Sequence, residues 1–262
     1  MKTCNNCGAA NPDAARFCNE CATALSSPAV PTKSIEKSAG LSASELAKSI
    51  TLKSSIIQSK RKADVMFVFD CTGSMAGEIN AIRDSIIAFA DTIEHDGVRV
   101  RVGLIEFRDR LIHEEARVLQ FEGQPFTTKP AIFRTEVAKL KATGGGDEPE
   151  SSLDAIMLAL RQPFSADANK VIVLITDAPP HIPDKETKSI EEAVNAIRSV
   201  GVSQLYIVMR TMDPKSQIYL KLLEGTRGLA FDLGKGDDFR ARSEHFKRTL
   251  MALGKTISAA TT

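Results

Sequence analysis

The distribution of apolar positions divides the chain of 262 residues into three parts. Residues 1–25 carry little apolar material beyond alanine, and residues 26–62 are rich in Ser, Lys, Pro and Ala. From residue 63 onward, β-rich apolar runs alternate with longer stretches whose apolar residues recur at helical spacing. The pattern predicts a small module at 1–25, a linker at 26–62 and one large domain at 63–262.

The large domain has the alternation of elements that is typical of an α/β fold. Strands are expected at 65–70, 98–107, 117–121, 170–176, 204–210 and 230–233. Helices are expected at 75–94, 128–141, 150–160, 186–200 and 215–224, with a closing helix from Phe239 and a short linker helix within 42–57. Because helices of this length separate the strands, crossover connections are required. We therefore predict a doubly wound, mostly parallel sheet with helices on both faces.

Charge and hydropathy narrow the classes of function. The net charge of +1 hides a basic linker, because residues 26–62 carry seven Lys/Arg against two Asp/Glu. The remaining large domain is mildly acidic, which argues against a role in nucleic-acid binding. No apolar run approaches the roughly 20 residues that span a bilayer, and the N-terminus lacks the apolar segment of a secretory signal. We expect a cytoplasmic protein without a membrane segment.

Four of the five cysteines form two Cys-x-x-Cys pairs within the first 21 residues. A module this short cannot build a hydrophobic core, so a bound metal would have to hold it together. Thiolates at this spacing are typical of a structural Zn²⁺ site, and a redox-active set is the alternative. The module resembles the short zinc ribbons of many bacterial proteins. The expected zinc ligands are Cys4, Cys7, Cys18 and Cys21.

Oxygen-bearing side chains follow two of the predicted strands of the large domain. The first strand runs directly into Asp70, with Thr72 and Ser74 just beyond, and a later apolar strand runs into Asp177. Ligands of open α/β sheets bind outside the carboxyl ends of the strands. Carboxylates and hydroxyls there suit a hard cation such as Mg²⁺, with Mn²⁺ or Ca²⁺ as alternatives. A strand-end turn with a helix N-cap is the structural alternative for the first motif.

The sequences DCTGS at 70–74 and ITD at 175–177 resemble the metal ion-dependent adhesion site of the von Willebrand factor A family. The resemblance covers about residues 63–235. The first motif of that family has the form Asp-x-Ser-x-Ser, and Thr72 keeps the hydroxyl of the first serine. The resemblance implies that Asp70, Thr72 and Ser74 hold the cation and that Asp177 is an outer, usually water-linked carboxylate.

The middle ligand departs from the pattern of that family. Many members supply a threonine from a Gly-Gly-Thr loop, whereas this chain has TGGGDEPE at 143–150. Asp147 stands where the threonine is expected, and Thr143 is the other candidate. Asp147 and Glu150 also have the spacing of a helix capping box, with Pro149 in the first turn. The triple-glycine form resembles the A domains found with alpha-type protein kinases.

The resemblance implies an adaptor without enzyme activity, in which an Asp or Glu carboxylate of a protein partner completes the Mg²⁺ shell. Such a partner could be a kinase, a phosphatase or an AAA-type ATPase. His181 and Arg108 follow strand ends and are candidate partner contacts. The alternative is a metal-dependent phosphohydrolase that uses Asp70. Against it, the position two residues after Asp70 holds Thr72 instead of a second acid, and the chain has no Walker-type phosphate loop.

Overall fold

The computed structural model describes residues 1–5, 7–11, 62–95, 99–146 and 148–233. The chain divides into two compact units, Met1–Ala47 and Lys48–Thr262, which are considered separately. The expected linker helix and closing helix lie outside the described residues, as do Cys18, Cys21 and Asp147. In the part of the chain that the structure describes, no helix combines the length and apolar character needed to cross a bilayer.

The N-terminal unit begins with a two-stranded antiparallel hairpin, β1 (Lys2–Thr3) and β2 (Ala10–Asn11). Cys4 follows β1 and is buried. Its N–H donates to the carbonyl of Ala9, and its own carbonyl accepts from the N–H of Gly8, both at 2.9 Å. Gly8 has a φ of 76°, a conformation that favours glycine. This tight turn carries the first Cys-x-x-Cys pair, as a metal-binding knuckle requires.

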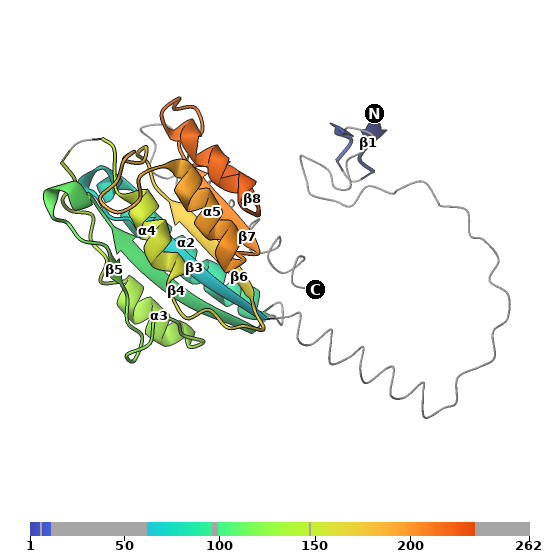
Figure 1. Ribbon diagram of the computed structural model, residues 1–262. Helices are drawn as coiled ribbons and strands as arrows, with labels where there is room; N and C mark the ends of the chain where they lie inside the picture. Colours follow the sequence, from blue (N-terminus) through green and yellow to red (C-terminus); the bar gives the residue numbers. More distant parts are fainter. Residues whose placement is uncertain (6, 12–61, 96–98, 147, 234–262) are drawn as a thin grey trace, which may run out of the picture. The chain divides into compact units, whose positions relative to one another are not determined.

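The second unit contains, within the described residues, a six-stranded sheet in the order β5–β4–β3–β6–β7–β8. β5 pairs with β4 in antiparallel fashion, and the other neighbouring strands are parallel. The mostly parallel sheet confirms the predicted fold class. The strands are β3 (Lys62–Asp70), β4 (Arg99–Phe107), β5 (Arg117–Val118), β6 (Asn169–Ile175), β7 (Gln204–Met209) and β8 (Arg227–Asp232) (Figure 1).

Helical segments connect these strands, with four departures from the predicted bounds. The helix predicted at 128–141 is shorter and covers Pro130–Val137. The segment predicted as one helix at 75–94 is divided into a 3-10 turn and α2. The predicted helix at 215–224 is a 3-10 helix, and the helix predicted from residue 186 begins later because the Ser189 side chain caps it by accepting from the N–H of Glu192. The segments are η1 (Gly73–Gly77), α2 (Ile79–His95), η2 (Arg110–Ile112), α3 (Pro130–Val137), α4 (Ser152–Leu160), α5 (Ile190–Val200) and η3 (Ser216–Glu224).

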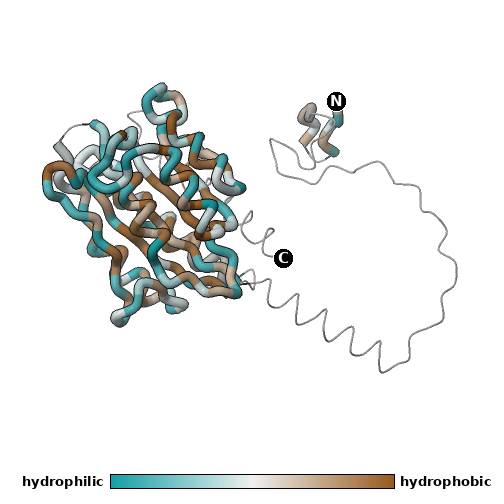
Figure 2. Tube along the Cα trace, viewed as in Figure 1, coloured by the Kyte–Doolittle hydropathy of each residue, from teal (hydrophilic) through white to brown (hydrophobic). Residues whose placement is uncertain are grey.

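Both faces of the sheet are buried under helices. Alternate residues of β3 face opposite sides: Phe67 and Phe69 pack in the cluster that includes α2 and α3, whereas Met66 and Val68 pack in the cluster that includes α4 and α5. All four side chains are fully buried. Hydropathy along the chain follows this arrangement, with apolar strands inside and polar loops at the strand ends (Figure 2). Burial on both faces explains why the strands are nearly continuous apolar runs.

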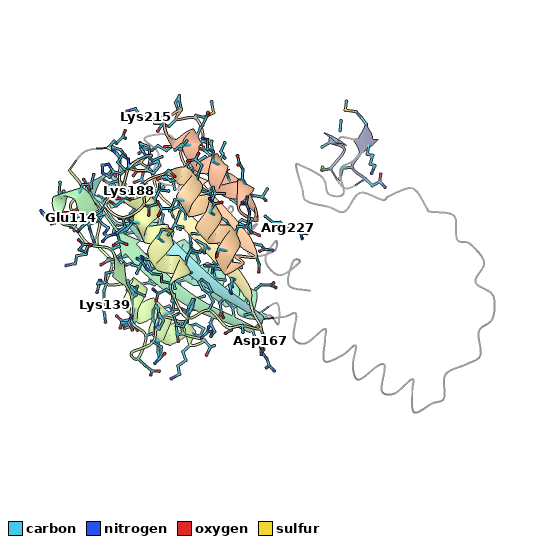
Figure 3. All side chains as sticks on the ribbon, in the orientation of Figure 1. Glu114, Lys139, Asp167, Lys188, Lys215 and Arg227 are labelled. Atoms are coloured by element: carbon cyan, nitrogen blue, oxygen red, sulfur yellow. The ribbon has the colours of Figure 1, made fainter. Side chains whose placement is uncertain are left out.

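The order of the strands creates a switch point between β3 and β6. From β3 the chain moves to β4 and β5 on one side, and then returns to add β6, β7 and β8 on the other. Glu114 and Lys215 lie near the carboxyl edge of the sheet, and Asp167 and Arg227 lie at the opposite edge (Figure 3). Ligand sites of open α/β sheets lie outside the carboxyl ends at such a switch point.

Candidate metal centre

Asp70 is the last residue of β3, and its side chain is fully buried. One carboxylate oxygen, Oδ1, accepts from the N–H of Thr72 at 3.0 Å and from its hydroxyl at 2.6 Å. The other, Oδ2, accepts from the hydroxyl of Thr176 at 2.7 Å. Burial raises the pKa of Asp70 to about 6, although these hydrogen bonds act to lower it, and the charge of Asp177 raises it further. The carboxylate is therefore held rigidly at the strand end.

The side chains of the two predicted motifs form one row of polar contacts. The hydroxyls of Thr72 and Ser74 lie 3.0 Å apart, and the Ser74 hydroxyl donates to Oδ1 of Asp177 at 2.9 Å. The row starts at Asp70 and crosses from the end of β3 to the end of β6, which are adjacent parallel strands. The structure thus brings together the four side chains that the sequence singled out.

The glycine loop at 144–146 packs directly against the first motif. The N–H of Gly73 donates to the carbonyl of Gly144 at 2.9 Å, and the N–H of Thr143 donates to the carbonyl of Cys71 at the same distance. A Cβ atom at Gly73 would lie 3.1 Å from that Gly144 oxygen, so a larger residue would have to push the loop slightly away. The close contact makes the glycine loop one wall of the site.

Arg210 follows β7 and was not predicted as a site residue. Its guanidinium donates to Oδ2 of Asp177 at 2.7 Å, and about a third of its side chain is exposed. Asp177 is almost fully buried and therefore receives one hydrogen bond at each oxygen, from Ser74 and Arg210. Among the described residues that line the cavity at this edge, Arg210 is the only basic one.

Glu150 is a second residue that sequence reasoning missed. It precedes α4, whose N-cap is Ser151, so the capping-box interpretation of Glu150 is wrong. Its backbone instead bridges to the segment after β6, with its N–H donating to the carbonyl of Pro179 and its carbonyl accepting from the N–H of His181, both at 2.9 Å. Only 4% of Glu150 is exposed, and its Oε2 has no hydrogen-bond partner among the described residues.

Burial and acidic neighbours favour the protonated form of Glu150. Burial raises its pKa to about 9, and the neighbouring charges of Asp70, Asp109, Glu114 and Asp177 raise it further. Arg210 is the only basic residue of the described cavity wall, and it pairs with Asp177. Without a cation the site therefore favours the protonated form of Glu150.

A cavity of about 210 Å³ lies at this edge of the sheet, between the first motif, the glycine loop and the segment after β6. It has room for a cation with several waters. No group of three His, Cys, Asp or Glu side chains among the described residues has the arrangement of a metal site, so a cation here would depend on hydroxyl ligands as well. Carboxylates, hydroxyls and water are the ligands that Mg²⁺ prefers. Together with the unpartnered Glu150 oxygen, this donor set fits a hard divalent cation. The lining residues are Thr72, Ser74, Gly144, Gly145, Gly146, Glu148, Glu150, Asp177, Ala178 and Arg210.

Comparison with known proteins identifies the large unit. Residues 64–233 match the family model described as von Willebrand factor A domain. The chain belongs to this family. Residues 3–25 match the model of the zinc-ribbon domain, in agreement with the interpretation of the N-terminal cysteines. We refer to the larger unit as the A domain.

The similar proteins are much longer than the regions that match. The alpha-protein kinase vwkA of Dictyostelium discoideum is 27% identical over 134 residues, which are 50% of this chain and 21% of that protein. The von Willebrand factor A domain-containing protein 7 of Homo sapiens is 34% identical over 121 residues, 45% of this chain and 12% of that protein. Because only a small part of each relative is covered, the similarity says nothing about the activities of the rest of those proteins.

A solved structure supports the fold alone. The open conformation of the pilus adhesin SpaC from Lactobacillus rhamnosus GG superposes with a TM-score of 0.56 at 14% identity. The superposition covers 75% of this chain and 30% of that one. At this level of identity the likeness concerns the arrangement of strands and helices of the A domain.

Three further predicted site residues of the A domain, Thr143, Arg108 and His181, have bracing contacts. Thr143 precedes the glycines that line the cavity, and its carbonyl accepts from Nε of Arg108 at 2.8 Å. Arg108 also donates to the carbonyl of Lys141 at 3.0 Å. His181 is largely buried, with Nε2 3.2 Å from Oδ1 of Asp109. The roles of Thr143 as a ligand and of Arg108 and His181 as partner contacts stay predictions.

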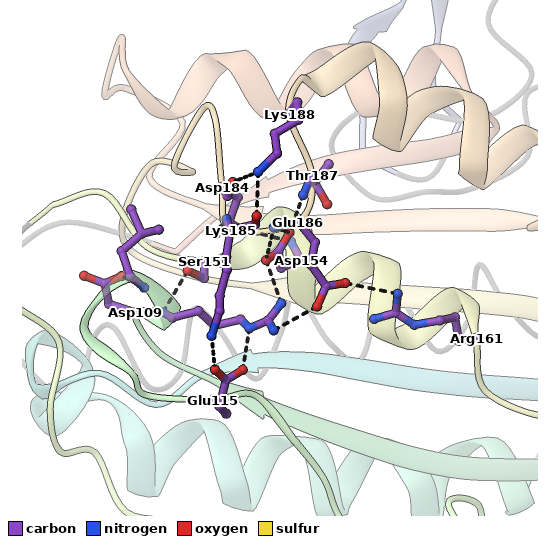
Figure 4. A network of polar contacts seen from close by, with 12 residues as sticks. Asp109, Glu115, Ser151, Asp154, Arg161, Asp184, Lys185, Glu186, Thr187 and Lys188 are labelled. Atoms are coloured by element: carbon purple, nitrogen blue, oxygen red, sulfur yellow. Dashed lines mark hydrogen bonds and ion pairs between the residues drawn. The ribbon is translucent and has the colours of Figure 1, made fainter.

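A second polar cluster, which we call the Arg110 clamp, connects the loops that border the site (Figure 4). Nη1 of Arg110 donates to Oδ2 of the fully buried Asp154 at 2.6 Å, and Nη2 donates to Glu186 at 2.9 Å. Asp154 also accepts from the N–H groups of Glu186 and Thr187. The clamp, defined as Arg110, Glu115, Asp154, Asp184 and Glu186, joins the segment after β4, the start of α4 and the segment before α5.

Proposed function

We propose that the A domain is a metal-dependent protein-interaction module whose cation, Mg²⁺ in the first place, is held by Asp70, Thr72, Ser74 and Asp177. When bound, the cation supplies a concentrated positive charge with a coordination position that an Asp or Glu carboxylate of a partner can occupy. The observation that carries the proposal is the row of polar contacts between these four side chains, which links two adjacent strand ends beside a cavity.

The hydrogen bonds of the row suit this task. The hydroxyl of Thr72 donates its proton to Asp70, and the hydroxyl of Ser74 donates to Asp177. Each hydroxyl oxygen therefore keeps lone pairs for a cation. Because Asp70 is anchored by Thr176 and by the Thr72 backbone, little side-chain entropy remains to be lost on binding.

The geometry favours binding over catalysis. A nucleophilic carboxylate must reach the substrate, but Asp70 is fully buried and both of its oxygens accept hydrogen bonds. Its environment resembles that of a fixed ligand more than that of a group that attacks phosphorus. We therefore propose that the A domain has no enzymatic activity of its own.

The N-terminal unit completes the proposed architecture. We propose that Cys4, Cys7, Cys18 and Cys21 hold a structural Zn²⁺, an assignment supported by the zinc-ribbon match and the tight turn at Gly8. A second binding unit on a basic tether would raise the effective concentration of a partner at the A domain. The nature of that partner as a kinase, phosphatase or AAA-type ATPase, and a cytoplasmic location, stay predictions.

Metal binding is tested first with the metal alone. We expect the zinc-loaded full chain, freed of other divalent cations, to bind Mn²⁺ and Mg²⁺ in calorimetric and electron paramagnetic resonance titrations. Asp70→Asn keeps the shape of the side chain but removes its charge, and should lower the affinity about 100-fold. Asp167→Asn, which removes an exposed carboxylate at the opposite edge, is the matched control. A wild-type chain that binds neither metal, or an Asp70→Asn chain that binds them equally well, contradicts the proposal.

Partner capture is tested with the same variants. The immobilised full chain is exposed to a cell extract with and without Mg²⁺, and captured proteins are identified by mass spectrometry. A specific partner should be retained by the wild type and by Asp167→Asn in Mg²⁺, and lost with Asp70→Asn or without Mg²⁺. Purified partner with each candidate Asp or Glu replaced by Asn or Gln then identifies the carboxylate. Capture that is independent of both the metal and Asp70 would exclude this mechanism.

A further inference from the structure

Large apolar side chains are exposed on the loops around the candidate metal centre. Among the described residues of the A domain, six large apolar side chains are exposed, and four of them follow the carboxyl ends of β4, β6 or β7. These four are Leu111 (48% exposed), Ile112 (47%), Ile182 (44%) and Met212 (75%), which we call the apolar rim; the other two are Leu220 in η3 and Leu229 in β8. Single exposed apolar residues are normal on protein surfaces, but a group from three loops around one cavity is typical of a binding surface.

The apolar rim adjoins the wall of the cavity. A Cβ atom built on Gly146, which lines the cavity, would lie 3.4 Å from Cδ1 of Ile112. Met212 follows Arg210, another lining residue, by two positions. Ile182 belongs to the segment after β6, which contributes further lining residues. A protein segment that reaches the cavity therefore has to pass over apolar side chains.

The loop that carries Leu111 and Ile112 is held firmly, although its tip is apolar and exposed. The N–H of Leu111 donates to Oδ1 of Asp109 at 2.8 Å, and the N–H of Arg110 donates to the hydroxyl of Ser151 at 2.9 Å. The Arg110 clamp fastens the same loop to the start of α4. A braced loop loses little conformational entropy when a partner binds. The fold thus presents two aliphatic side chains in a fixed position beside the cavity.

We propose that the apolar rim binds a large apolar side chain that stands close in sequence to the acidic residue of the partner. The inference rests on the proposed metal-dependent function and specifies the partner segment that the site takes. The proposed cation and the partly exposed guanidinium of Arg210 are complementary in charge to the carboxylate of that segment, and Leu111 and Ile112 offer apolar surface to its neighbour. An anionic membrane is a poorer occupant, because Glu114 follows the rim in the same loop and Glu148 lines the cavity, and both would repel it.

A peptide library tests the inference. The probe is a phage-displayed library with a fixed central Asp or Glu between random residues, selected on the zinc-loaded full chain in Mg²⁺. We expect enrichment of Leu, Ile, Met or Phe near the fixed acid. In fluorescence anisotropy titrations with an enriched peptide, Leu111→Ser and Ile112→Ser should each lower the affinity about 5- to 10-fold, because the buried apolar contact is lost. The matched control is Leu229→Ser, since Leu229 is also half exposed but lies within β8, and it should bind like the wild type.

The outcomes separate this inference from the function on which it rests. Metal-dependent peptides without an apolar preference, or with one that both rim variants retain, overturn the inference and leave the metal function standing. Peptides that bind equally well without Mg²⁺ or to Asp70→Asn defeat the proposed function itself.

Other occupants of the rim give different results. Dimers in sedimentation velocity that Leu111→Ser abolishes would mean that a second copy covers the rim, and would overturn the inference. Binding to phosphatidylserine vesicles in place of peptides would overturn it too. A library that yields no metal-dependent peptide also overturns it, and Mn²⁺ titration then shows whether the metal site stands. Misfolding is excluded by thermal unfolding, because variants of exposed side chains should melt within about 2 °C of the wild type.

Discussion

Two groups of buried acidic side chains lie at the carboxyl edge of the same sheet and are treated differently by the fold. In the Arg110 clamp, Asp154 pairs with a guanidinium and accepts from two backbone N–H groups. In the candidate metal centre, Asp70 and Glu150 are also buried, yet Arg210 is the only basic residue of the described cavity wall and pairs with Asp177. Within the described residues, the carboxylates of the clamp have their partners, whereas the candidate metal centre leaves Oε2 of Glu150 without one.

The contrast shows which buried charges indicate a ligand. Burial alone does not, because Asp154 is fully buried and has a structural explanation. A buried carboxyl group that lacks hydrogen-bond partners does indicate a ligand. At the candidate metal centre, this lack of partners is visible as the unpartnered oxygen of Glu150. The hydroxyls of Thr72 and Ser74 line the same cavity, and they suit the hard cation that we propose as the missing group. The difference between the two groups can be tested by removing charge from each.

The largest effect is expected in the clamp. Arg110→Met keeps an apolar stem but leaves Asp154 buried without its counter-charge, and should lower the free energy of unfolding by about 3 kcal/mol. Urea denaturation of the metal-free chain measures the change. Arg161→Met is the matched control, because Arg161 pairs with Glu186 of the clamp on the exposed side and should contribute less than about 0.5 kcal/mol. If the two variants lose equal stability, the clamp is no more than a set of surface contacts.

The next prediction concerns Arg210, whose replacement should lower the stability of the metal-free chain but raise its affinity for a cation. Arg210→Gln removes the partner of Asp177 and should lower the unfolding free energy of the metal-free chain by about 1 to 2 kcal/mol. The same change removes a positive charge next to the cation, so the affinity for Mn²⁺ should rise about threefold or more, with like-charge repulsion removed. Unfolding and Mn²⁺ titration of one preparation measure both quantities. A fall in Mn²⁺ affinity would mean that Arg210 organises the site instead of competing with the cation.

The fold and the strand ends of the candidate metal centre could be predicted from the sequence, because both follow from local patterns of apolar residues. The apolar run into Asp70 and the later run into Asp177 indicate strand ends, and parallel strands bring such ends to one edge. The doubly wound fold follows from the alternation of strands and helices, as the family match confirms. The strand predicted at 117–121 is too long, because β5 ends at Val118, although the N–H of Leu119 still donates to the carbonyl of Leu104 in β4.

The missed residues depend on contacts between distant segments. Glu150 has the local signature of a capping box, and its bridge to Pro180 has no local signal at all. Arg210 could have been found, since it follows β7 just as Arg108 follows β4, and residues that follow parallel strands converge. The clamp required the approach of Arg110 to Asp154, which are 44 positions apart. Pairing of side chains across loops is set by the tertiary fold, not by periodicity.

The smallest expected effect is a pH dependence within the clamp. Burial raises the pKa of Asp184 above its ordinary value of 3.8, although the N–H of Lys185 donates to its carboxylate and acts to lower it. The folded chain therefore retains this proton after the unfolded chain has lost it, and the unfolding free energy falls as pH rises upward from 3.8 through the raised pKa. Asp184→Asn has no such proton, so the wild-type stability relative to this variant should decrease across that window and then level off. Urea unfolding of both metal-free chains, from below 3.8 to neutral pH, measures the difference and cancels the groups that they share. A difference that grows with pH would mean that the clamp stabilises the ionised carboxylate of Asp184, so that its compensation is as complete as that of Asp154.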